Sequence, residues 1–242
     1  MRIYSDLAPW FHLLTHPVEY EQEARFIERV VDAVSDGRAR TLLELGSGGG
    51  NNASHLKRRF ECMLTDLSEE MLELSRSLNP ECEHLVADMR TLRLGRTFDV
   101  VLVHDAIAYM TTEDDLRAAI ETAAAHARPG GVAVFHPDTT RESFAPATDH
   151  GGHDGDDGRG LRYLQWTHDP DPSDTTYEVD FAVLLREPGR PARVELDHHT
   201  VGVFPEATWR SALEDAGLEV VDPGVEDPYA DERSTFVGRR RA

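Results

Sequence analysis

Residues Thr41–Asn52 read TLLELGSGGGNN. The run Leu42–Leu45, interrupted by Glu44, has the length of a buried strand, and it leads directly into the glycine-rich turn Gly46–Gly50 and then into a helical pattern. Glycine lets a ligand come close to the backbone because no Cβ stands in the way. A helix N-terminus adds free N–H groups. The stretch therefore predicts a binding site of the nucleotide type.

The composition limits the class of protein. The chain has 242 residues, 40% of them hydrophobic, and this suits one folded domain with room for an insert. A formal net charge of −20 disfavours nucleic acid and anionic membrane surfaces as partners. No apolar run approaches the roughly 20 residues that span a bilayer. The N-terminus has no signal-peptide pattern, and Cys62 and Cys82 are expected to be thiols, so we expect a cytoplasmic protein.

Short apolar runs alternate with helical patterns on both sides of the turn. Strands are expected at Thr41–Leu45, Cys62–Thr65, His84–Ala87, Phe98–His104 and Val132–His136. Helices are expected at Asn52–Arg59, Glu69–Leu78, Glu113–Ala127 and Pro205–Ala216, and final strands at Leu218–Val221 and Ser234–Val237. This order predicts an α/β, Rossmann-like fold with a doubly wound, mostly parallel seven-stranded sheet whose last strand is antiparallel. The carboxyl ends of its parallel strands then share one edge, where ligands bind.

Two segments stand outside this alternation. Residues 1–36 predict an N-terminal helical lid, with helices over Tyr4–Leu14 and Val18–Val34. Residues 139–204 predict an antiparallel β insert over the carboxyl edge. Its expected strands are Leu161–Thr167, Thr176–Arg186 and Arg193–Phe204, preceded by a mobile loop over Asp149–Gly160. Residues 37–138 and 205–242 then form the binding core.

Polar residues follow the predicted strands at the carboxyl edge. Asp66 ends the second strand and is placed to bind both hydroxyls of a ribose, although it could instead cap the next helix. Asp88 and Met89 follow the third strand and suit an adenine, with Asp88 near the exocyclic amine. His104 and Asp105 follow the fourth strand. Together with the glycine turn, these make four features at successive strand ends, and the set is more specific than any one of them.

Two nucleotide interpretations compete for the turn. A dinucleotide site of a nicotinamide-dependent oxidoreductase requires G-x-G-x-x-G, but Asn51 occupies the position of the third glycine. The run reads instead Glu44-x-Gly46-x-Gly48-x-Gly50. A pyrophosphate cradle is therefore a poor match.

Over about Arg38–Asp138 the chain resembles the class I S-adenosylmethionine-dependent methyltransferases. The segments that carry the resemblance are LLELGSGGG, LTDLSEEML, VADMRTL, FDVVLVHDAIAYM and RPGGVAVF. The chain is also similar to bacterial small-molecule N-methyltransferases that make dimethylamino sugars. This second similarity rests on the aromatic N-terminal helices, the DMR–LGR–FD run, the antiparallel insert and the VFP–helix–AGL ending.

The resemblance implies S-adenosylmethionine as the cofactor and assigns positions around it. These are Gly46, Ser47 and Gly48 for the methionine part, Asp66 for the ribose, Leu67, Asp88 and Met89 around the adenine, and His104, through its backbone, at the methionine end. His12 and Tyr20 fall near N-terminal residues that close over the cofactor, although His12 stands where a tyrosine is usual. A homodimer is also implied.

The activity expected from this resemblance is methyl transfer to a small-molecule acceptor, an amine in the first place. O-methylation of a hydroxyl and a non-catalytic cofactor-binding regulator remain alternatives. Candidate catalytic residues are Tyr109, His104 and His198, with Asp105 as a group that attracts a cationic amine. Because side chains alternate along a strand, only one of His198 and His199 can face the cleft. We expect no metal, since His150 and His153 lie among flexible glycines.

Overall fold

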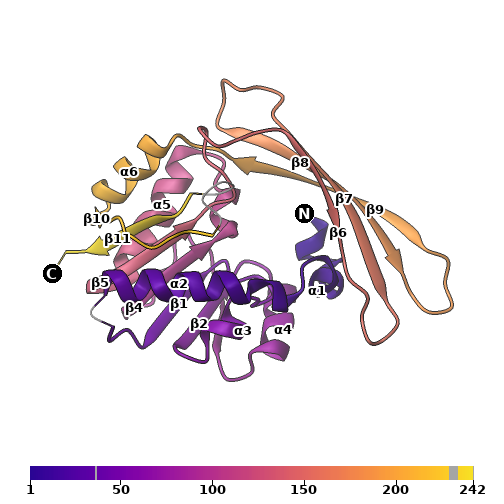
Figure 1. Cartoon of the computed structure of the whole chain (residues 1–242), viewed down its shortest axis with the longest axis horizontal. Coiled ribbons are helices and arrows are strands. Elements are labelled where there is room, and N and C mark those ends of the chain that lie inside the picture. Colours follow the sequence, from indigo (N-terminus) through magenta and orange to yellow (C-terminus); the bar gives the residue numbers. More distant parts are fainter. Residues whose placement is uncertain (36, 229–233, 242) are drawn as a thin grey trace.

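A computed structural model describes residues 1–35, 37–228 and 234–241, so parts of the predicted ranges 1–36 and 205–242 lie outside the described residues. A seven-stranded sheet runs through the core in the order β10-β11-β5-β4-β1-β2-β3 (Figure 1). Its strands are β1 Thr41–Leu45, β2 Glu61–Asp66, β3 Glu83–Val86, β4 Phe98–His104, β5 Ala127–His136, β10 Leu218–Val220 and β11 Phe236–Arg240. Strands β1 to β5 pair in parallel, and β11 is antiparallel to both β5 and β10. The predicted sheet is confirmed.

Helices cover both faces of this sheet because successive strand residues point to opposite sides. Leu42 of β1 packs with α2 (Glu21–Val34) and α3 (Ala53–Leu56), whereas Leu43 belongs to the core formed with α5 (Glu113–His126) and α6 (Glu206–Asp215). Helix α4 (Glu69–Leu78) contacts β2 and β3. Each such fully buried leucine stabilises the fold by about 1.5–3 kcal/mol. No helix in the described part of the chain has the length and apolar character needed to cross a membrane.

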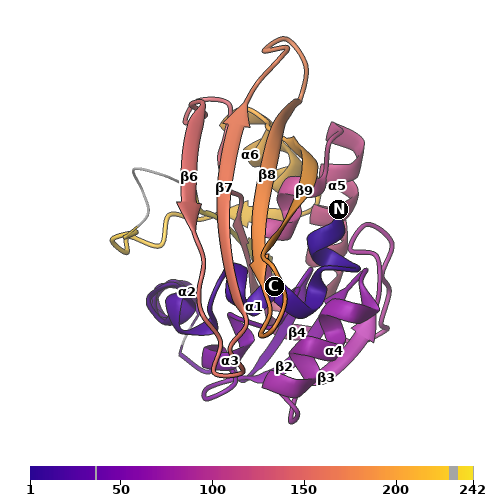
Figure 2. The same ribbon diagram turned by 90° about the vertical axis from the view of Figure 1, so that its right-hand side faces the viewer.

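A second, four-stranded antiparallel sheet stands over the carboxyl edge of the first. Its order is β6-β7-β8-β9, with bounds β6 Ala147–Gly151, β7 Gly160–His168, β8 Thr176–Arg186 and β9 Arg193–Gly202. Figure 2 shows these long strands side by side in front of the core. Near the end of β9, Gly202 packs so tightly on the Met110 backbone that a Cβ there would collide with the Met110 carbonyl oxygen. The insert is therefore anchored close to the end of β4.

The prediction of a loop over Asp149–Gly160 was wrong at both ends, because Asp149–Gly151 belong to β6 and Gly160 begins β7. Residues Ala147–Gly151 form the edge strand β6, which pairs antiparallel with β7, and Asp154 forms a bridge to Gly160. An edge strand is held through its backbone, and the side chains of β6 are almost all exposed, so its sequence carries no apolar alternation.

The N-terminal segment also differs from its prediction. A continuous helix over Tyr4–Leu14 is replaced by short turns, namely η1 Arg2–Tyr4, η2 Ala8–Trp10, α1 Phe11–Leu14 and η3 Pro17–Tyr20. Pro9 explains the break, because its ring disfavours a helical conformation in the residue before it and it lacks an N–H. The segment lies between the core sheet and the insert (Figure 1), and its apolar residues pack with Leu161, Val183 and Leu185 of the insert.

Candidate active site

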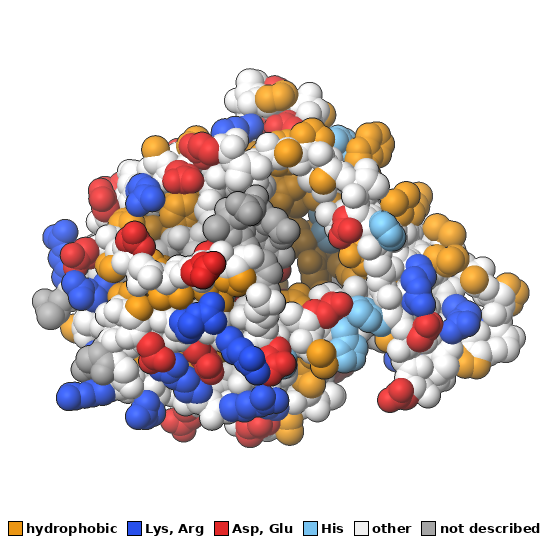
Figure 3. Space-filling model, viewed as in Figure 1, with side chains coloured by type: hydrophobic (Ala, Val, Ile, Leu, Met, Phe, Trp, Pro, Cys, Tyr) orange, Lys and Arg blue, Asp and Glu red, His pale blue; other side chains and the backbone are white. Residues whose placement is uncertain are grey.

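A cavity of about 870 Å³ separates the carboxyl edge of the large sheet from the insert. Figure 3 shows the hollow between these two parts, with hydrophobic side chains inside it. One side, here called the sheet wall, comprises the turns after β1 to β4; its lining residues include Glu44, Gly46–Gly49, Asn51, Asn52, Asp66–Ser68, Met89, His104–Ala106, Tyr109 and Met110. The other, the insert wall, comprises Tyr163, Gln165, Thr167, Tyr177, Val179, Phe181, Val183, Asp197, His199 and Val201. The N-terminal segment, including Tyr4 and Tyr20, fills the side between them.

The glycine turn is built as predicted from its sequence. Gly46, Gly48 and Gly50 have φ values of 73°, 52° and 77°, which L-residues other than glycine rarely adopt. The N–H groups of Gly46 and Ser47 both donate to the Thr65 carbonyl oxygen at 2.8 Å. A Cβ on Gly46 would collide with the Ala106 side chain. The backbone of Gly46, Ser47 and Gly48 therefore lies at the cavity surface in one fixed conformation.

Asp66 joins this turn to the end of β2. Its Oδ2 accepts from the Gly48 N–H at 2.8 Å, and its Oδ1 accepts from the Ser68 N–H at 2.9 Å. Burial raises the pKa of this carboxyl. The alternative role in capping belongs to Ser68, whose hydroxyl accepts from the Met71 N–H at the start of α4. Asp66 is thus held at the cavity surface with both oxygens oriented.

The residues predicted to surround an adenine separate into two groups. Leu67 is 65% exposed at the cavity, and Met89 lines it beside Gly46. Asp88, in contrast, does not belong to the described lining. Arg90 donates from Nε and Nη2 to its carboxylate, at 3.1 and 2.7 Å to Oδ2, and lowers the pKa of Asp88. The structure therefore brings Leu67 and Met89, but not the Asp88 carboxylate, to the cavity surface, and the adenine subsite stays a prediction.

Several polar groups lie below the glycine turn, where the methionine part of the cofactor is predicted to bind. Burial raises the pKa of Glu44, which is 3% exposed, to about 8. Glu44 Oε2, Ser47 Oγ and Asn52 Oδ1 are buried without a hydrogen-bond partner among the described residues, and all three residues line the cavity. Buried polar atoms are normally paired, so this end of the cavity fits a ligand that supplies hydrogen-bond donors, as an ammonium group does.

His104 forms the floor beside these groups. Its Nε2 forms an ion pair with Glu23 of α2, its Nδ1 lies 3.2 Å from Asp105 Oδ2, and its ring stacks on His136 at a centroid distance of 5.2 Å. Burial alone would raise the pKa of Glu23, but His104, together with His136 and Asn52, outweighs this effect and lowers the pKa to about 2. This side chain is therefore held as part of an ionic floor that ties α2 to the end of β4.

The two N-terminal candidates occupy different places. Tyr20 lines the cavity, and its hydroxyl accepts from Thr15 Oγ1 at 3.1 Å. His12 is not in the described lining; its Nε2 lies 3.2 Å from the Gly49 carbonyl oxygen on the outer side of the turn. In this structure His12 supports the turn, and its contact with the cofactor stays a prediction.

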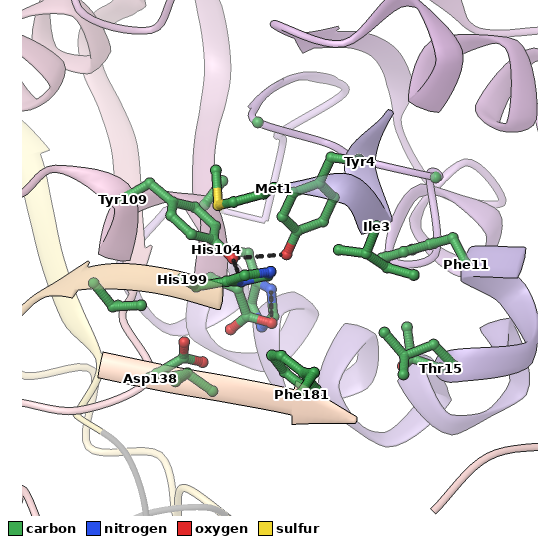
Figure 4. A pocket seen from close by; sticks show the side chains of 18 of the residues that line it. Met1, Ile3, Tyr4, Phe11, Thr15, His104, Tyr109, Asp138, Phe181 and His199 are labelled. Atoms are coloured by element: carbon green, nitrogen blue, oxygen red, sulfur yellow. Dashed lines mark hydrogen bonds and ion pairs between the residues drawn. The ribbon is translucent and has the colours of Figure 1, made fainter. Parts of the chain in front are cut away.

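Tyr109 stands where the sheet wall meets the insert wall. Its hydroxyl lies 2.9 Å from that of Tyr4 and 2.8 Å from Nδ1 of His199 (Figure 4). His199 Nε2 lies 3.1 Å from Asp197 Oδ2, which also accepts from the Ile3 N–H at 2.8 Å. Burial raises the pKa of Tyr109 and lowers that of His199. Tyr109 thus lies in the predicted place, with a histidine and a carboxylate behind it.

The placement of His198 in the cleft is corrected. Along β9, Asp197, His199 and Val201 face the cavity, so His198 lies on the outer face of the insert. There its ring contacts Asp180 and Glu178, each at 2.8 Å. The alternation along the strand allowed either His198 or His199 to face the cavity. The register with β8 pairs His199 with Val179, which lines the cavity, so His199 is the one that faces inward.

Several residues of this site were not predicted, namely Tyr4, Glu23, Glu44 and Asp197. Tyr4 and Tyr109 are 105 residues apart in sequence, and no local pattern joins them. For the insert wall one signal was available in the sequence. Tyr177, Val179, Phe181 and Val183 alternate with other residues along β8 and define its apolar inner face. Cys62 and Cys82, expected as thiols, are both free.

Comparison with known proteins shows which family this site belongs to. Residues 42–131 match the model of the methyltransferase domain. The chain is 32% identical over 204 residues to dTDP-3-amino-3,4,6-trideoxy-alpha-D-glucopyranose N,N-dimethyltransferase from Streptomyces venezuelae, covering 84% of each chain. The protein belongs to the S-adenosylmethionine-dependent methyltransferases. It is an enzyme of this family, with S-adenosylmethionine as its cofactor.

Solved structures agree with this assignment. Streptomyces venezuelae DesVI superposes with a TM-score of 0.83 at 27% identity, over 99% of this chain and 98% of its own. The amino pentose methyltransferase CalS10 from Micromonospora echinaspora, solved with S-adenosylmethionine bound, gives a TM-score of 0.77 at 25% identity over 91% of each chain. The methyltransferase therefore shares the Rossmann-like fold of these structures, over almost all of this chain in the case of DesVI.

Proposed function

We propose that this methyltransferase N-methylates an amine on a small molecule of the amino-sugar class, in a biosynthetic pathway. The observation that carries the proposal is the charge of the cavity. Six of its described lining residues are acidic, namely Glu44, Asp66, Asp105, Asp138, Asp149 and Asp197, and of these Glu44 carries a proton at neutral pH until a cation binds beside it. A cleft lined by one sign of charge attracts ligands of the opposite sign. An amine arrives as a cation and gains from this field, whereas a hydroxyl acceptor does not.

The relatives support the same class of acceptor. The Streptomyces venezuelae relative is named for a 3-amino sugar, and CalS10 for an amino pentose. The insert wall offers aromatic surfaces of the size of a sugar ring, with Tyr163 and Phe181 in edge-to-face contact at 6.2 Å between ring centroids. Aromatic faces and a few polar groups are the usual lining of such pockets.

For the cofactor we propose the following contacts. Asp66 binds the ribose, Leu67 and Met89 enclose the adenine, and the Gly46–Gly48 backbone with Glu44 and Asn52 holds the methionine end. S-adenosylmethionine supplies an activated methyl group when bound. The contribution of the chain is then orientation and exclusion of water, and such alignment can provide roughly 7–11 kcal/mol.

The test is a paired acceptor assay. The protein is incubated with methyl-labelled S-adenosylmethionine and either an amino sugar or the same sugar with a hydroxyl in place of the amine. Each is supplied both free and linked to dTDP. Transfer to the amino compounds alone supports the proposal. Transfer to the hydroxyl compounds instead would establish O-methylation and reject it.

We also propose that the enzyme is a homodimer through the outer face of the insert. This face exposes five large apolar side chains, Leu164, Trp166, Leu184, Val194 and Leu196, two of them more than 60% exposed. Arg162 and Arg186 lie beside the acidic Asp154, and Glu178 and Asp180 lie further along the same face. A face with both charges can complement a second copy of itself about a two-fold axis.

Sedimentation of Leu196→Glu tests the dimer. We expect the wild type to sediment as a dimer and the variant as a monomer, with Val18→Glu, at a site 66% exposed elsewhere, as the matched control. A wild-type monomer at micromolar concentration would overturn the dimer. A cytoplasmic location and the absence of a nucleic acid partner stay predictions.

A further inference from the structure

Four side chains form one continuous hydrogen-bonded chain from the cavity into the insert. The successive contacts are 2.9 Å between the hydroxyls of Tyr4 and Tyr109, 2.8 Å from Tyr109 to His199 Nδ1, and 3.1 Å from His199 Nε2 to Asp197 Oδ2. They come from η1, from η4 (Asp105–Tyr109) and from β9. Figure 4 shows Tyr4, Tyr109 and His199 meeting at the cavity surface. All four residues line the cavity.

The chemistry of the end groups fixes the direction of every hydrogen bond. An ionised carboxylate only accepts, so His199 Nε2 carries the hydrogen and donates to Asp197. His199 Nδ1 is then an acceptor, and the Tyr109 hydroxyl donates to it. Tyr109 in turn accepts from Tyr4. The Tyr4 oxygen is left with lone pairs and no hydrogen to offer, which suits an ammonium N–H at the cavity surface.

We propose that His199, reached through Tyr4 and Tyr109 and held by Asp197, accepts the proton that an ammonium acceptor must lose before it can be methylated. The inference rests on the proposed N-methylation. One acceptor N–H bond breaks and its electron pair stays on nitrogen. The proton passes to the Tyr4 oxygen while the Tyr4 proton passes to Tyr109 and the Tyr109 proton to His199 Nδ1. The freed lone pair is then the nucleophile for the methyl group, and the imidazolium returns its proton to solvent.

The surroundings of His199 suit this role. It is 3% exposed, and burial, with smaller effects of the Met1 ammonium and His198, lowers its pKa, while Asp197 acts in the opposite direction. The ring is therefore neutral and ready to accept at neutral pH. Tyr4 and Tyr109 face it from the other elements, and burial raises both of their pKa values, so they relay a proton without ionising. Asp105 and Asp138 act on these two hydroxyls in the same direction.

Two variants interrupt the chain at different points, and a third is the control. His199→Asn removes the proton acceptor, and Tyr109→Phe removes only the hydroxyl that leads to it. His198→Asn changes the neighbouring residue on the outer face. For each protein, kcat/KM with an amine acceptor is measured from about pH 6 to about pH 10, spanning histidine and amine titration. Cofactor affinity is measured by calorimetry in parallel.

We expect His199→Asn and Tyr109→Phe to lose roughly 100-fold or more near neutral pH, the size of a general-base effect. Only amine that is already neutral in solution can then react, so kcat/KM should rise about tenfold per pH unit up to the pKa of the amine. The double variant should be no worse than either single one. The wild type and His198→Asn should show a shallow profile, and all variants should bind the cofactor normally.

Nitrogen NMR of the unliganded enzyme provides an independent readout. With ¹⁵N-labelled histidine, the signals lost in His199→Asn should be those of a neutral ring with hydrogen on Nε2. An equal loss of rate at every pH, an unchanged profile in both variants, or the opposite tautomer would each overturn the relay. If the wild type binds the cofactor but methylates no amine, the proposed function fails instead.

Discussion

The two walls of the cavity hold their polar groups in different ways. The sheet wall depends on its backbone: Gly46 and Ser47 share the Thr65 carbonyl oxygen, and Asp66 is fixed between two N–H groups. The insert wall depends on side chains that alternate along extended strands, so that His199 faces inward and His198 outward. A side chain on such a strand can be exchanged without moving the backbone. We therefore expect the sheet wall to fix the methyl donor and the insert wall to set the acceptor.

The largest expected effect is that of Gly46→Ala in the sheet wall. Its positive φ costs a non-glycine residue about 1–2 kcal/mol, and the collision with Ala106 adds about 1–3 kcal/mol. Gly95→Ala is the matched control, since Gly95 also has a positive φ, of 69°, but open space around it. Urea unfolding of both variants measures the difference. Equal losses of stability would show that the turn is less tightly packed than the structure indicates.

A smaller effect is expected for Asp66→Ala. Loss of charge-assisted hydrogen bonds to the ribose should weaken cofactor binding by about 1.5–3 kcal/mol, roughly 10- to 100-fold in Kd. Calorimetric titration with S-adenosylhomocysteine measures it. Asp88→Ala is the control, because its carboxylate is bound by Arg90 rather than exposed to the cavity. Should Asp88→Ala lose as much affinity as Asp66→Ala, the ribose site would need to be reassigned.

Phe181→Ala examines the insert wall and should act on the acceptor alone. Its ring lies 5.1 Å from that of His199, and an aromatic contact of this kind is worth about 0.5–1.5 kcal/mol. We expect the KM for the acceptor to rise severalfold while cofactor affinity is unchanged. Leu184→Ala, on the outer face of the same strand, should alter neither quantity. An equal change in cofactor affinity would mean that the two walls do not divide the ligands between them.

The smallest expected effect is the loss of stability in His198→Asn, on the outer face of the insert. Asp180, with smaller contributions from Glu178, raises the pKa of the exposed His198 above its usual value of 6.5. Its contribution to stability is therefore complete below the unfolded pKa and is lost as pH rises through the folded pKa. His198→Asn should cost less than about 1 kcal/mol at about pH 5 and nothing measurable at about pH 9. Denaturant titrations at both pH values test this, and a larger loss at the higher pH would contradict it.

Local sequence was sufficient to predict which residues form the sheet wall. The glycine turn, Asp66 and Met89 each follow a short apolar strand, and the parallel sheet places strand ends at one edge whatever the details of pairing. Asp88 shows the limit of this reasoning, since its neighbour Arg90 binds it and turns it from the cavity.

The residues of the insert wall and of the N-terminal segment that face the cavity could be identified only from the structure. One residue of register decides between His198 and His199, and the sequence does not specify that register. Edge strand β6 was missed because backbone pairing holds it while its side chains stay exposed. The contact between Tyr4 and Tyr109 depends on how separate elements pack, which no periodicity encodes.

Glu44 gives the cavity a further property. Its pKa of about 8 means that the folded protein carries a proton on this carboxyl at neutral pH, since burial disfavours the charged form. A cationic ligand group at the Glu44 carboxyl favours the ionised form, so binding and proton release are linked. We therefore expect the cavity to release a proton from Glu44 when the positively charged cofactor binds, and to take one up again when the product, which has lost the sulfonium charge, leaves.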